Sequence, residues 1–343
     1  MAKKIRVLVV DDSILARKVI MDGLGAIPNL EVVGYAINAI DAKSKVKQLR
    51  PDVMTLDVQM PGMTGLDFLK SFLPEYPLPV VLVSALNMGA FDALHAGAVD
   101  FVRKPDRDVS TGDFIATLAR SVQDASRAKV QRPAAAAAVE AGPPALGGTI
   151  AGRTVIALGA STGGTEATLE VMKRLPADIP GMVIVQHMPV GFTKMYAERL
   201  NKLCRMEVRE AKEGDEVKRG VALIAPADLQ TRVVRSPLGG YRVSCTHGDR
   251  VSGHRPSVDV LFQSMADNVR CQMVGIIMTG MGRDGASGLL AMRKKGAYTI
   301  GQDEDTCVVY GMPRAAYEDG AVMVQAGCKE IAGVLLRRLR GGR

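Results

Sequence analysis

Apolar positions along this 343-residue chain follow two patterns that alternate. Short runs of β-branched and aliphatic residues, such as IRVLVV, VMTLDV and PVVLVS, have the length and composition of buried strands. Between them lie segments with helical spacing of apolar positions, such as SILARKVIMDGLGAI. Strands that alternate with helices indicate a parallel sheet covered by helices on both faces. We therefore predict an α/β protein whose first domain, residues 1–122, is a (βα)5 unit.

A stretch with few large apolar residues separates this unit from a second one. Residues 123–151 contain an alanine run, Pro133, Pro143–Pro144 and Gly147–Gly148, which together predict a flexible interdomain linker. The alternating pattern then returns in TVIALGA, GMVIVQH, VALIAP, MVGIIMTG and AYTIGQ. For residues 152–343 we predict a doubly wound, mostly parallel α/β domain. The segment RVVRSPLGGYRVSCT adds a small β-hairpin, with its turn at 237–240.

Composition narrows the classes of function. The chain is 47% hydrophobic and 23% charged, and because no run of 18 apolar residues occurs we expect no membrane insertion. Five scattered cysteines form no C-x-x-C pair and no signal-peptide pattern is present, so we expect reduced thiols in the cytoplasm. The net charge is +8, with all of the excess after residue 120. Trp is absent and aromatic residues make up 4%, so this excess favours an acidic protein partner and no nucleic acid.

Polar side chains stand at the predicted carboxyl ends of the strands in the first domain. These positions hold Asp11, Asp12, Asp57, Ser84 and Lys104. In an open parallel sheet such ends meet at one edge, where ligands bind. Three converging carboxylates require a cation, and oxygen ligands favour Mg²⁺. A carboxylate beside Mg²⁺ and a lysine can attack a phosphoryl group, and Ser84 can then hydrogen-bond the acquired phosphate.

The alternative is a structural role, in which Asp12 caps the helix SILARKVI and Asp57 caps a loop. Against it stands a resemblance that covers residues 1–120. The pair DD at 11–12, the loop LDVQMPGMTG around Asp57, Ser84 and the pair KP at 104–105 resemble a response-regulator receiver domain.

This resemblance implies a role for each residue of the pocket. Asp57 is expected to be the phosphoacceptor. A Mg²⁺ ion is expected on Asp12, Asp57 and the carbonyl of Gln59, with Asp11 in support. Ser84, Phe101 and Lys104 are the expected phosphate-responsive positions, and the Lys104–Pro105 bond is expected to be cis.

In the second domain, one serine lies on a predicted strand-to-helix turn. The strand VIAL ends at Gly159, and Gly163–Gly164 lead into TEATLEVMKRL. This G-x-S-x-G pattern lifts the hydroxyl of Ser161 above the sheet and places helix N–H groups where an oxyanion develops. The alternative is a glycine-rich loop that packs closely or holds a phosphate. The spacing matches neither G-x-G-x-x-G nor G-x-x-x-x-G-K-[ST], so nucleotide binding is the weaker alternative.

Three histidines of the second domain are candidate general bases. His187 ends the predicted strand MVIVQH, at the same sheet edge as Ser161. His247 and His254 lie in the polar loop THGDRVSGHRPS, where a histidine is more often solvated or hydrogen-bonded. Asp284 lies in the loop TGMGRDGASG, where its alternative role is a helix N-cap.

Ser161, His187 and Asp284 each follow a different predicted strand at its carboxyl end. This placement predicts a nucleophile activated by a base and an orienting acid. The order Ser–His–Asp differs from the Ser–Asp–His order of α/β-hydrolases. It therefore indicates a separate catalytic lineage on a doubly wound sheet.

Residues 152–335 resemble the catalytic domain of the chemotaxis protein-glutamate methylesterases/protein-glutamine glutaminases, the CheB family. Six motifs occur in order and carry the resemblance: GASTGGTEA, QHMPVGFT, ERLNKLC, HRPSVDVLF, TGMGRDGA and CVVYGMPR. It implies that Ser161 is the nucleophile, His187 the base and Asp284 its orienting acid, and that the N–H of Met281 helps to form the oxyanion hole.

The implied reaction is hydrolysis of glutamyl methyl esters on chemoreceptors, which releases methanol, together with deamidation of receptor glutamines. It requires no cofactor beyond the Mg²⁺ of the receiver domain. The implied partners are methyl-accepting chemoreceptors as substrate and a chemotaxis histidine kinase as phosphodonor. We also expect the unphosphorylated receiver to limit access to Ser161. Two alternatives stay open, namely a phosphorylation-dependent binding module without chemistry and a hydrolase whose target is a methyl ester outside the receptors.

Overall fold

Two separate parallel sheets organise the chain, one within residues 1–137 and the other within residues 138–343. The computed structural model describes residues 3–84, 89–107, 109–130, 145–147 and 154–341. Most of the predicted linker, residues 123–151, therefore lies outside the described residues.

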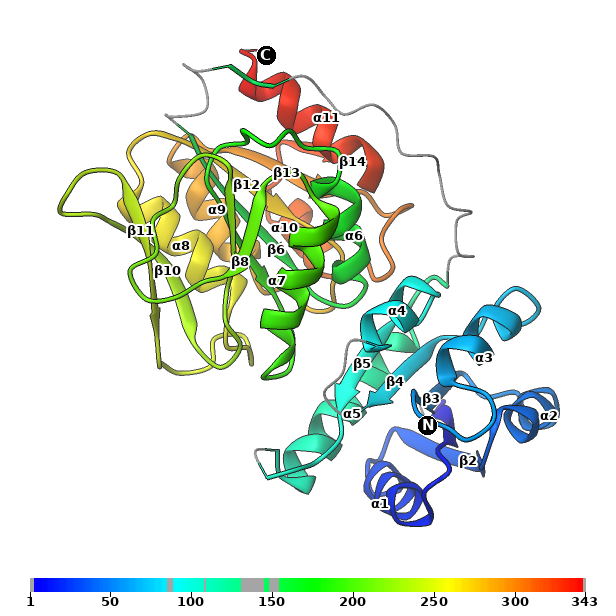
Figure 1. Cartoon of the computed structure of the whole chain (residues 1–343). Coiled ribbons are helices and arrows are strands. Elements are labelled where there is room, and N and C mark those ends of the chain that lie inside the picture. The colour runs from blue at the N-terminus through cyan, green and yellow to red at the C-terminus, as the bar shows by residue number, and fades with distance from the viewer. Residues whose placement is uncertain (1–2, 85–88, 108, 131–144, 148–153, 342–343) are drawn as a thin grey trace. The chain divides into compact units, whose positions relative to one another are not determined.

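The N-terminal unit has the predicted (βα)5 architecture. Its five strands pair in parallel in the order β2-β1-β3-β4-β5. Helices α1 and α5 pack together, and α2, α3 and α4 pack in a row, so the sheet carries helices on both faces (Figure 1). The strands are β1 (Ile5–Val10), β2 (Leu30–Ala36), β3 (Val53–Asp57), β4 (Val80–Ser84) and β5 (Asp100–Arg103). The helices are α1 (Ile14–Gly25), α2 (Ala39–Leu49), α3 (Gly65–Phe72), α4 (Gly89–His95) and α5 (Thr111–Ala125).

Side-chain N-caps explain where four of these helices begin. Ser13, Asn38, Thr64 and Ser110 each accept a hydrogen bond from the backbone N–H three residues further on. Since Ser13 caps α1, the alternative role considered for Asp12 as its cap is wrong. Asp12 remains available to the sheet edge.

The C-terminal unit contains a seven-stranded parallel sheet and the predicted hairpin. The strand order is β14-β13-β12-β6-β7-β9-β8, so β6 lies in the middle. The strands that follow β6 in sequence, β7 to β9, lie on one side of it. The last three strands, β12 to β14, lie on the other side. The strands are β6 (Thr154–Ala160), β7 (Met182–Gln186), β8 (Glu207–Glu210), β9 (Val221–Ile224), β10 (Gln230–Arg235), β11 (Tyr241–Thr246), β12 (Gln272–Ile277), β13 (Tyr298–Gln302) and β14 (Val324–Ala326).

Six helices cover this sheet in two groups (Figure 1). Helices α8, α9 and α10 pack together, as do α6, α7 and α11. The antiparallel hairpin β10–β11 pairs Arg235 with Tyr241 across the predicted turn. The helices are α6 (Gly164–Met172), α7 (Phe192–Leu203), α8 (Val258–Asn268), α9 (Ala286–Lys294), α10 (Met312–Glu318) and α11 (Cys328–Leu339). The reversal of strand order between β6 and β12 creates a switch point, which is where open α/β sheets bind ligands.

A short described part of the predicted linker is attached to the C-terminal unit. The amides of Leu146 and Gly147 donate to the carboxylate of Asp178, at 3.0 and 3.2 Å, and Arg219 pairs with the same carboxylate. The side chain of Leu146 is buried. Residues 145–147 are therefore part of the second unit's surface.

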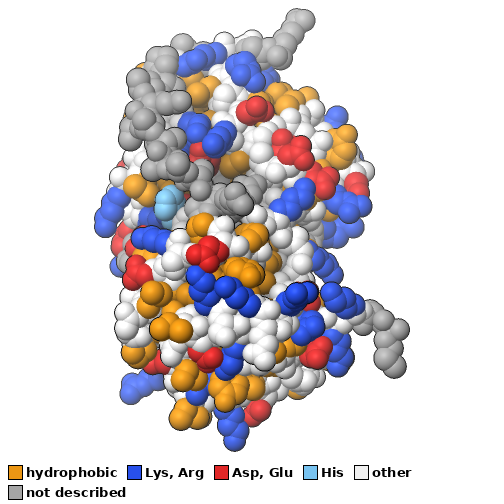
Figure 2. All heavy atoms as spheres, turned by 90° about the vertical axis from the view of Figure 1, so that its right-hand side faces the viewer, with side chains coloured by type: hydrophobic (Ala, Val, Ile, Leu, Met, Phe, Trp, Pro, Cys, Tyr) orange, Lys and Arg blue, Asp and Glu red, His pale blue; other side chains and the backbone are white. Residues whose placement is uncertain are grey.

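The surface shows no concentration of one charge on the face drawn in Figure 2, where Lys and Arg side chains lie among Asp, Glu and apolar side chains. Among the described helices, none has the length and hydropathy needed to cross a bilayer.

Candidate active site

The turn after β6 holds Ser161 at the centre of the switch point. Its N–H donates to the carbonyl of Thr279 (2.9 Å), and its carbonyl accepts from Gln186 Nε2 (2.8 Å). These bonds fix the serine between the segment that follows β12 and the last residue of β7. Gly163 has φ +76°, a conformation that favours glycine, and a Cβ there would lie 2.5 Å from Val308. The glycine is therefore required for this turn.

Helix α6 begins directly behind the serine without a side-chain cap. Among the described residues, the backbone N–H groups of Thr162 and Gly163 have no acceptor. Unsatisfied N–H groups at a helix start can receive negative charge. The turn thus offers donors to an oxyanion formed next to Ser161.

His187 follows β7 and is tied to the neighbouring loop through one ring nitrogen. Its Nε2 lies 2.9 Å from Oδ2 of Asp284, and its side chain is 9% exposed. Its Nδ1 is buried and has no hydrogen-bond partner among the described residues. Nδ1 is therefore the ring nitrogen left for a reacting group.

Asp284 is held by the start of helix α8, which it reaches from the loop after β12. The carboxylate accepts from Ser257 Oγ (2.7 Å), Val258 N (2.8 Å) and Asp259 N (3.0 Å), in addition to its bond with His187. Burial alone would raise the pKa of Asp284, but the bonds from His187, Ser257 and the Asp259 amide outweigh burial and hold that pKa below its usual value. The carboxylate therefore stays charged beside His187.

Asp284 does not cap its own helix, because Gly285 is the N-cap residue of α9. It caps α8 instead, and Asp259 in the first turn of α8 accepts from Gly288 N of α9 at 2.7 Å. The loop before α9 thus provides a carboxylate to the start of α8, and the first turn of α8 provides a carboxylate to α9. This reciprocal pair of caps fixes Asp284 relative to the sheet.

The loop that contains Met281 passes against the serine. A Cβ on Gly280 would lie 2.6 Å from the Cβ of Ser161, so the two backbones are in close contact. The carbonyl of Gly280 accepts from Gly311 N (3.1 Å) and Met312 N (2.8 Å), which holds the loop in place. Met281, the residue expected in the oxyanion hole, therefore adjoins the Ser161 turn.

The structure brings these residues together to different degrees. His187 and Asp284 are directly bonded, and Gly280 packs on Ser161. Between the side chains of Ser161 and His187 the described residues show no hydrogen bond. Such bonds are often long before substrate binds. Of the other candidate bases, His247 is exposed, whereas His254 stacks on His187.

The sequence patterns assign no role to Ser257 at this site, and they indicate His254 only as a candidate base. Both lie in the segment HRPSVDVLF, which begins at His254 and has Ser257 as its fourth residue. A serine before a helix indicates only an N-cap, and a loop histidine is more often solvated or hydrogen-bonded than catalytic. The motif itself was the available signal, but it gave no role for these two positions.

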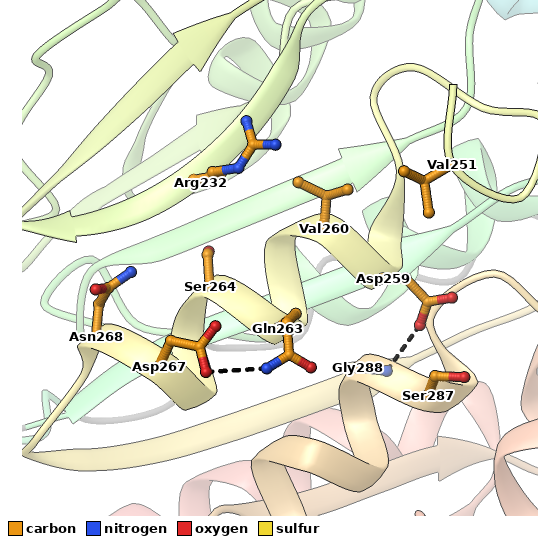
Figure 3. Close-up of a pocket in the computed structure, with 10 residues that line it drawn as sticks. All are labelled: Arg232, Val251, Asp259, Val260, Gln263, Ser264, Asp267, Asn268, Ser287 and Gly288. Carbon is orange, nitrogen blue, oxygen red and sulfur yellow. Dashed lines mark hydrogen bonds between the residues drawn. The ribbon is translucent and has the colours of Figure 1, made fainter. Parts of the chain in front are cut away.

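A groove of about 440 Å³ lies beside this site, along α8 and the hairpin (Figure 3). Asp259 lines it, and the bond from this carboxylate to Gly288 is drawn there. The residues that line it are Arg232, Val251, Asp259, Val260, Gln263, Ser264, Asp267, Asn268, Ser287 and Gly288. Ser161, His187 and Asp284 are not among them.

The N-terminal unit carries a separate acidic pocket at the carboxyl edge of its sheet. Oxygen atoms of Asp11, Asp12 and Asp57 lie within 4.8 Å of one another. Lys104 Nζ bridges two of these carboxylates, at 2.8 Å from Asp11 and 2.7 Å from Asp57. The N–H of Gln59 donates to Asp57 Oδ1 (3.1 Å), so the backbone of Gln59 also lies at the pocket.

Charge in this pocket is only partly compensated by Lys104. Burial raises the pKa of Asp57, against the lowering effect of the Lys104 hydrogen bond and the Gln59 amide. Burial would lower the pKa of Lys104, but its bonds to Asp11 and Asp57 outweigh burial and raise it. A cluster of three carboxylates with hard oxygen donors fits a divalent cation such as Mg²⁺.

The other expected phosphate-responsive residues lie in the neighbouring strands β4 and β5. Ser84 ends β4 and is buried, and Phe101 in β5 is buried edge-on against Phe91, with ring centroids 5.9 Å apart. The expected cis bond at Lys104–Pro105 is wrong, because the one cis bond among the described residues is Arg255–Pro256. The N–H of Lys104 instead continues the strand ladder to Ser84 O (2.8 Å), with the trans isomer that X–Pro bonds ordinarily favour.

Family models match both units. The CheB methylesterase model matches residues 156–335, and the response regulator receiver domain model matches residues 7–111.

Whole-chain relatives agree with this assignment. The chain is 51% identical over 325 residues to protein-glutamate methylesterase/protein-glutamine glutaminase 2 of Syntrophomonas wolfei, covering 94% of each chain. It is 43% identical to the protein of that name, without the numeral, from Salmonella typhimurium, covering 99% of this chain and 98% of the relative. The crystal structure of the Thermotoga maritima CheB methylesterase catalytic domain aligns at a TM-score of 0.53 and 33% identity, over 55% of this chain and 98% of that one. The chain therefore belongs to the CheB family of protein-glutamate methylesterases/protein-glutamine glutaminases, with a receiver domain in front of the catalytic domain.

Proposed function

We propose that this protein is a phosphorylation-regulated hydrolase of chemotaxis adaptation. It removes methyl groups from glutamyl methyl esters of chemoreceptors and converts receptor glutamines to glutamates. The observation that carries the proposal is the buried pair of His187 and Asp284 beside the Ser161 turn, 2.9 Å apart. The names of relatives that match nearly the whole chain support the substrate class.

In the proposed reaction, Ser161 Oγ attacks the γ-carbonyl carbon of the substrate side chain and gives its proton to His187 Nδ1. Asp284 keeps the opposite ring nitrogen bonded and stabilises the imidazolium that forms. Negative charge on the carbonyl oxygen is received by the N–H of Met281 and by the free N–H groups at the start of α6.

The tetrahedral intermediate then collapses. The C–O bond to the methoxy group breaks, His187 returns its proton to that oxygen, and methanol leaves. A water molecule attacks the acyl-serine by the same route and releases the glutamate. For a glutamine substrate the leaving group is ammonia. No cofactor takes part in these steps.

In the receiver domain, Asp57 is the proposed phosphoacceptor. Mg²⁺ held by Asp12, Asp57 and the carbonyl of Gln59, with Asp11 in support, would neutralise charge on the transferring phosphoryl group. Lys104 would also neutralise charge on this group, and Ser84 would hydrogen-bond the product phosphate. Phe101 is proposed to change position when Ser84 binds the phosphate. The phosphodonor is a chemotaxis histidine kinase.

Phosphorylation is proposed to relieve a restriction that the receiver places on Ser161. A coupling free energy of about 1–3 kcal/mol changes activity 5–150-fold. Residues 145–343 alone should therefore be more active than the unphosphorylated full chain. If the fragment is no more active, restriction by the receiver is wrong.

The five cysteines are free thiols, which fits the proposed cytoplasmic location.

The direct experiment measures methanol release from methylated receptor membranes, with and without a phosphodonor. Ser161→Ala should lower release by several orders of magnitude, as in other serine triads. Ser236→Ala, in the hairpin turn, is the matched control and should leave it unchanged. If Ser161→Ala releases methanol at the wild-type rate, Ser161 is not the nucleophile and the proposed chemistry is wrong. If the wild-type chain releases no more methanol than receptor membranes alone, the chain is a binding module. Methanol release from another esterified protein, with none from receptors, would place the substrate elsewhere.

A further inference from the structure

A second imidazole ring covers the ring of His187. The centroids of His187 and His254 are 3.7 Å apart, and their planes are inclined by only 7°. Aromatic pairs ordinarily prefer offset or edge-to-face geometry over full overlap. The surrounding chain must therefore hold His254 in this position.

The turn that carries His254 is closely specified. Val251 and His254 exchange two backbone hydrogen bonds, at 3.0 and 2.9 Å. Between them, Ser252 has φ 53° and Gly253 has φ 81°. Two successive left-handed residues make the tight turn that joins such a pair, and a serine in this region is uncommon. Ser252 therefore accepts a strained conformation in a turn that fixes His254.

A buried glutamine connects this turn to the residues that hold Asp284. Gln230 Nε2 donates to the carbonyl of His254 (3.2 Å), and its Oε1 accepts from Ser257 N (2.9 Å). Ser257 is the residue whose hydroxyl binds Asp284. The side chain of Gln230 therefore helps to fix both His254 and Ser257.

His187 needs such a neighbour because it has only one ring hydrogen bond among the described residues. The bond at Nε2 fixes one atom, while rotation about the Cβ–Cγ bond has a broad energy profile. A flat ring at 3.7 Å restricts this rotation and excludes water from one face. The buried Nδ1 is then kept at a fixed angle.

We propose that His254 is a positioning residue that fixes the plane of His187, so that Nδ1 is aligned for proton transfer from Ser161. This inference rests on the proposed function, because it assigns His254 to the same reaction. The face of the His254 ring also attracts the positive charge that His187 acquires during attack, as in cation–π contacts.

The test uses the full chain and methylated receptor membranes. His254→Ala should lower kcat about 10- to 100-fold, the range expected when a reacting group loses its alignment, with KM unchanged. His254→Phe retains a flat ring and should recover most of the lost kcat. His247→Ala, an exposed histidine in the same polar loop, is the matched control and should match wild type. Thermal unfolding and Ser161→Ala are measured alongside.

The outcomes separate this inference from the function on which it rests. If Ser161→Ala is inactive and His254→Ala keeps the wild-type kcat, the proposed function stands and the positioning role is wrong. If His254→Phe is folded but as impaired as His254→Ala, a flat ring is not what matters, and the inference is also overturned. If His254→Ala fails to fold, the test rests on His254→Phe. A folded and active His254→Phe supports the proposal, and a folded but impaired His254→Phe refutes it. Activity in Ser161→Ala would instead refute the proposed function.

Discussion

Ser257→Ala removes the shortest hydrogen bond to the acid of the proposed triad. Ser257 Oγ lies 2.7 Å from Asp284 Oδ1, and the serine is fully buried, so water cannot replace the lost donor. Oδ1 would keep only the Asp259 amide, at 3.0 Å. The same substitution also removes the side-chain cap of α8, whose bond to Val260 N is 3.4 Å.

The two losses have different sizes. A hydrogen bond to a charged group contributes about 1.5–3 kcal/mol. An ordinary serine cap contributes about 1 kcal/mol, and glycine replaces it at a cost of only a few tenths. We expect Ser257→Ala to cost about 2–4 kcal/mol in total. Ser257→Gly should recover only the smaller, capping part. Because His187 then faces a less firmly held carboxylate, kcat should fall about tenfold, which corresponds to 1.36 kcal/mol.

Hydrogen–deuterium exchange of the first turn of α8 measures the local effect, and denaturant unfolding measures the total. Ser110→Ala is the matched control, because Ser110 caps α5 without contact to the proposed triad. If Ser257→Ala costs no more than Ser110→Ala and leaves kcat unchanged, the Asp284 carboxylate does not depend on its bond to Ser257.

Three further changes test other parts of the structure. Gly159→Ala would place a Cβ 2.2 Å from Val258 Cγ1, so it should lower the free energy of unfolding by about 1–3 kcal/mol and lower kcat. Gly25→Ala, where a Cβ has no neighbour within 4 Å, should change neither. Equal unfolding midpoints for the two variants would contradict this expectation. Because the pKa of Asp284 is lowered by folding, its stabilisation is complete above the ordinary value of 3.8 and is lost as the pH falls through the folded value. The unfolding free-energy difference between wild type and Asp284→Asn should therefore narrow below about pH 4; a constant difference would contradict the assigned direction. Removal of Mg²⁺ with EDTA should abolish activation by a phosphodonor and leave basal methanol release intact, and activation that survives EDTA would refute the metal site.

The sequence predicts the positions of the candidate site residues well because parallel strands impose a simple rule. Ser161, His187 and the loop with Asp284 each follow an apolar run, and the carboxyl ends of parallel strands must share one edge. The same rule places Asp57 and Lys104 in the receiver. Strand and helix patterns therefore predict which residues gather, even where element boundaries shift.

Contacts between segments far apart in the chain are not predictable in this way. The position of His254 depends on a turn closed by Val251 and on Gln230, which belongs to another strand. The alternative role considered for Asp284 was a cap of the helix that follows it, but the helix whose N–H groups it binds is α8, far from it in sequence. Such contacts depend on tertiary packing, and a local pattern carries no information about the partner.

The central place of β6 has a consequence for synthesis of the protein. β6 is the first strand of its sheet to be made, and β12, which pairs with one of its edges, is made only after the hairpin. Until then a nascent chain carries an uncovered apolar edge, the kind of surface that invites misassembly. The loop beside Ser161 is secured later still, by Gly311 and Met312. Chains that end before residue 311 therefore contain Ser161 but lack the contacts that hold the loop beside it.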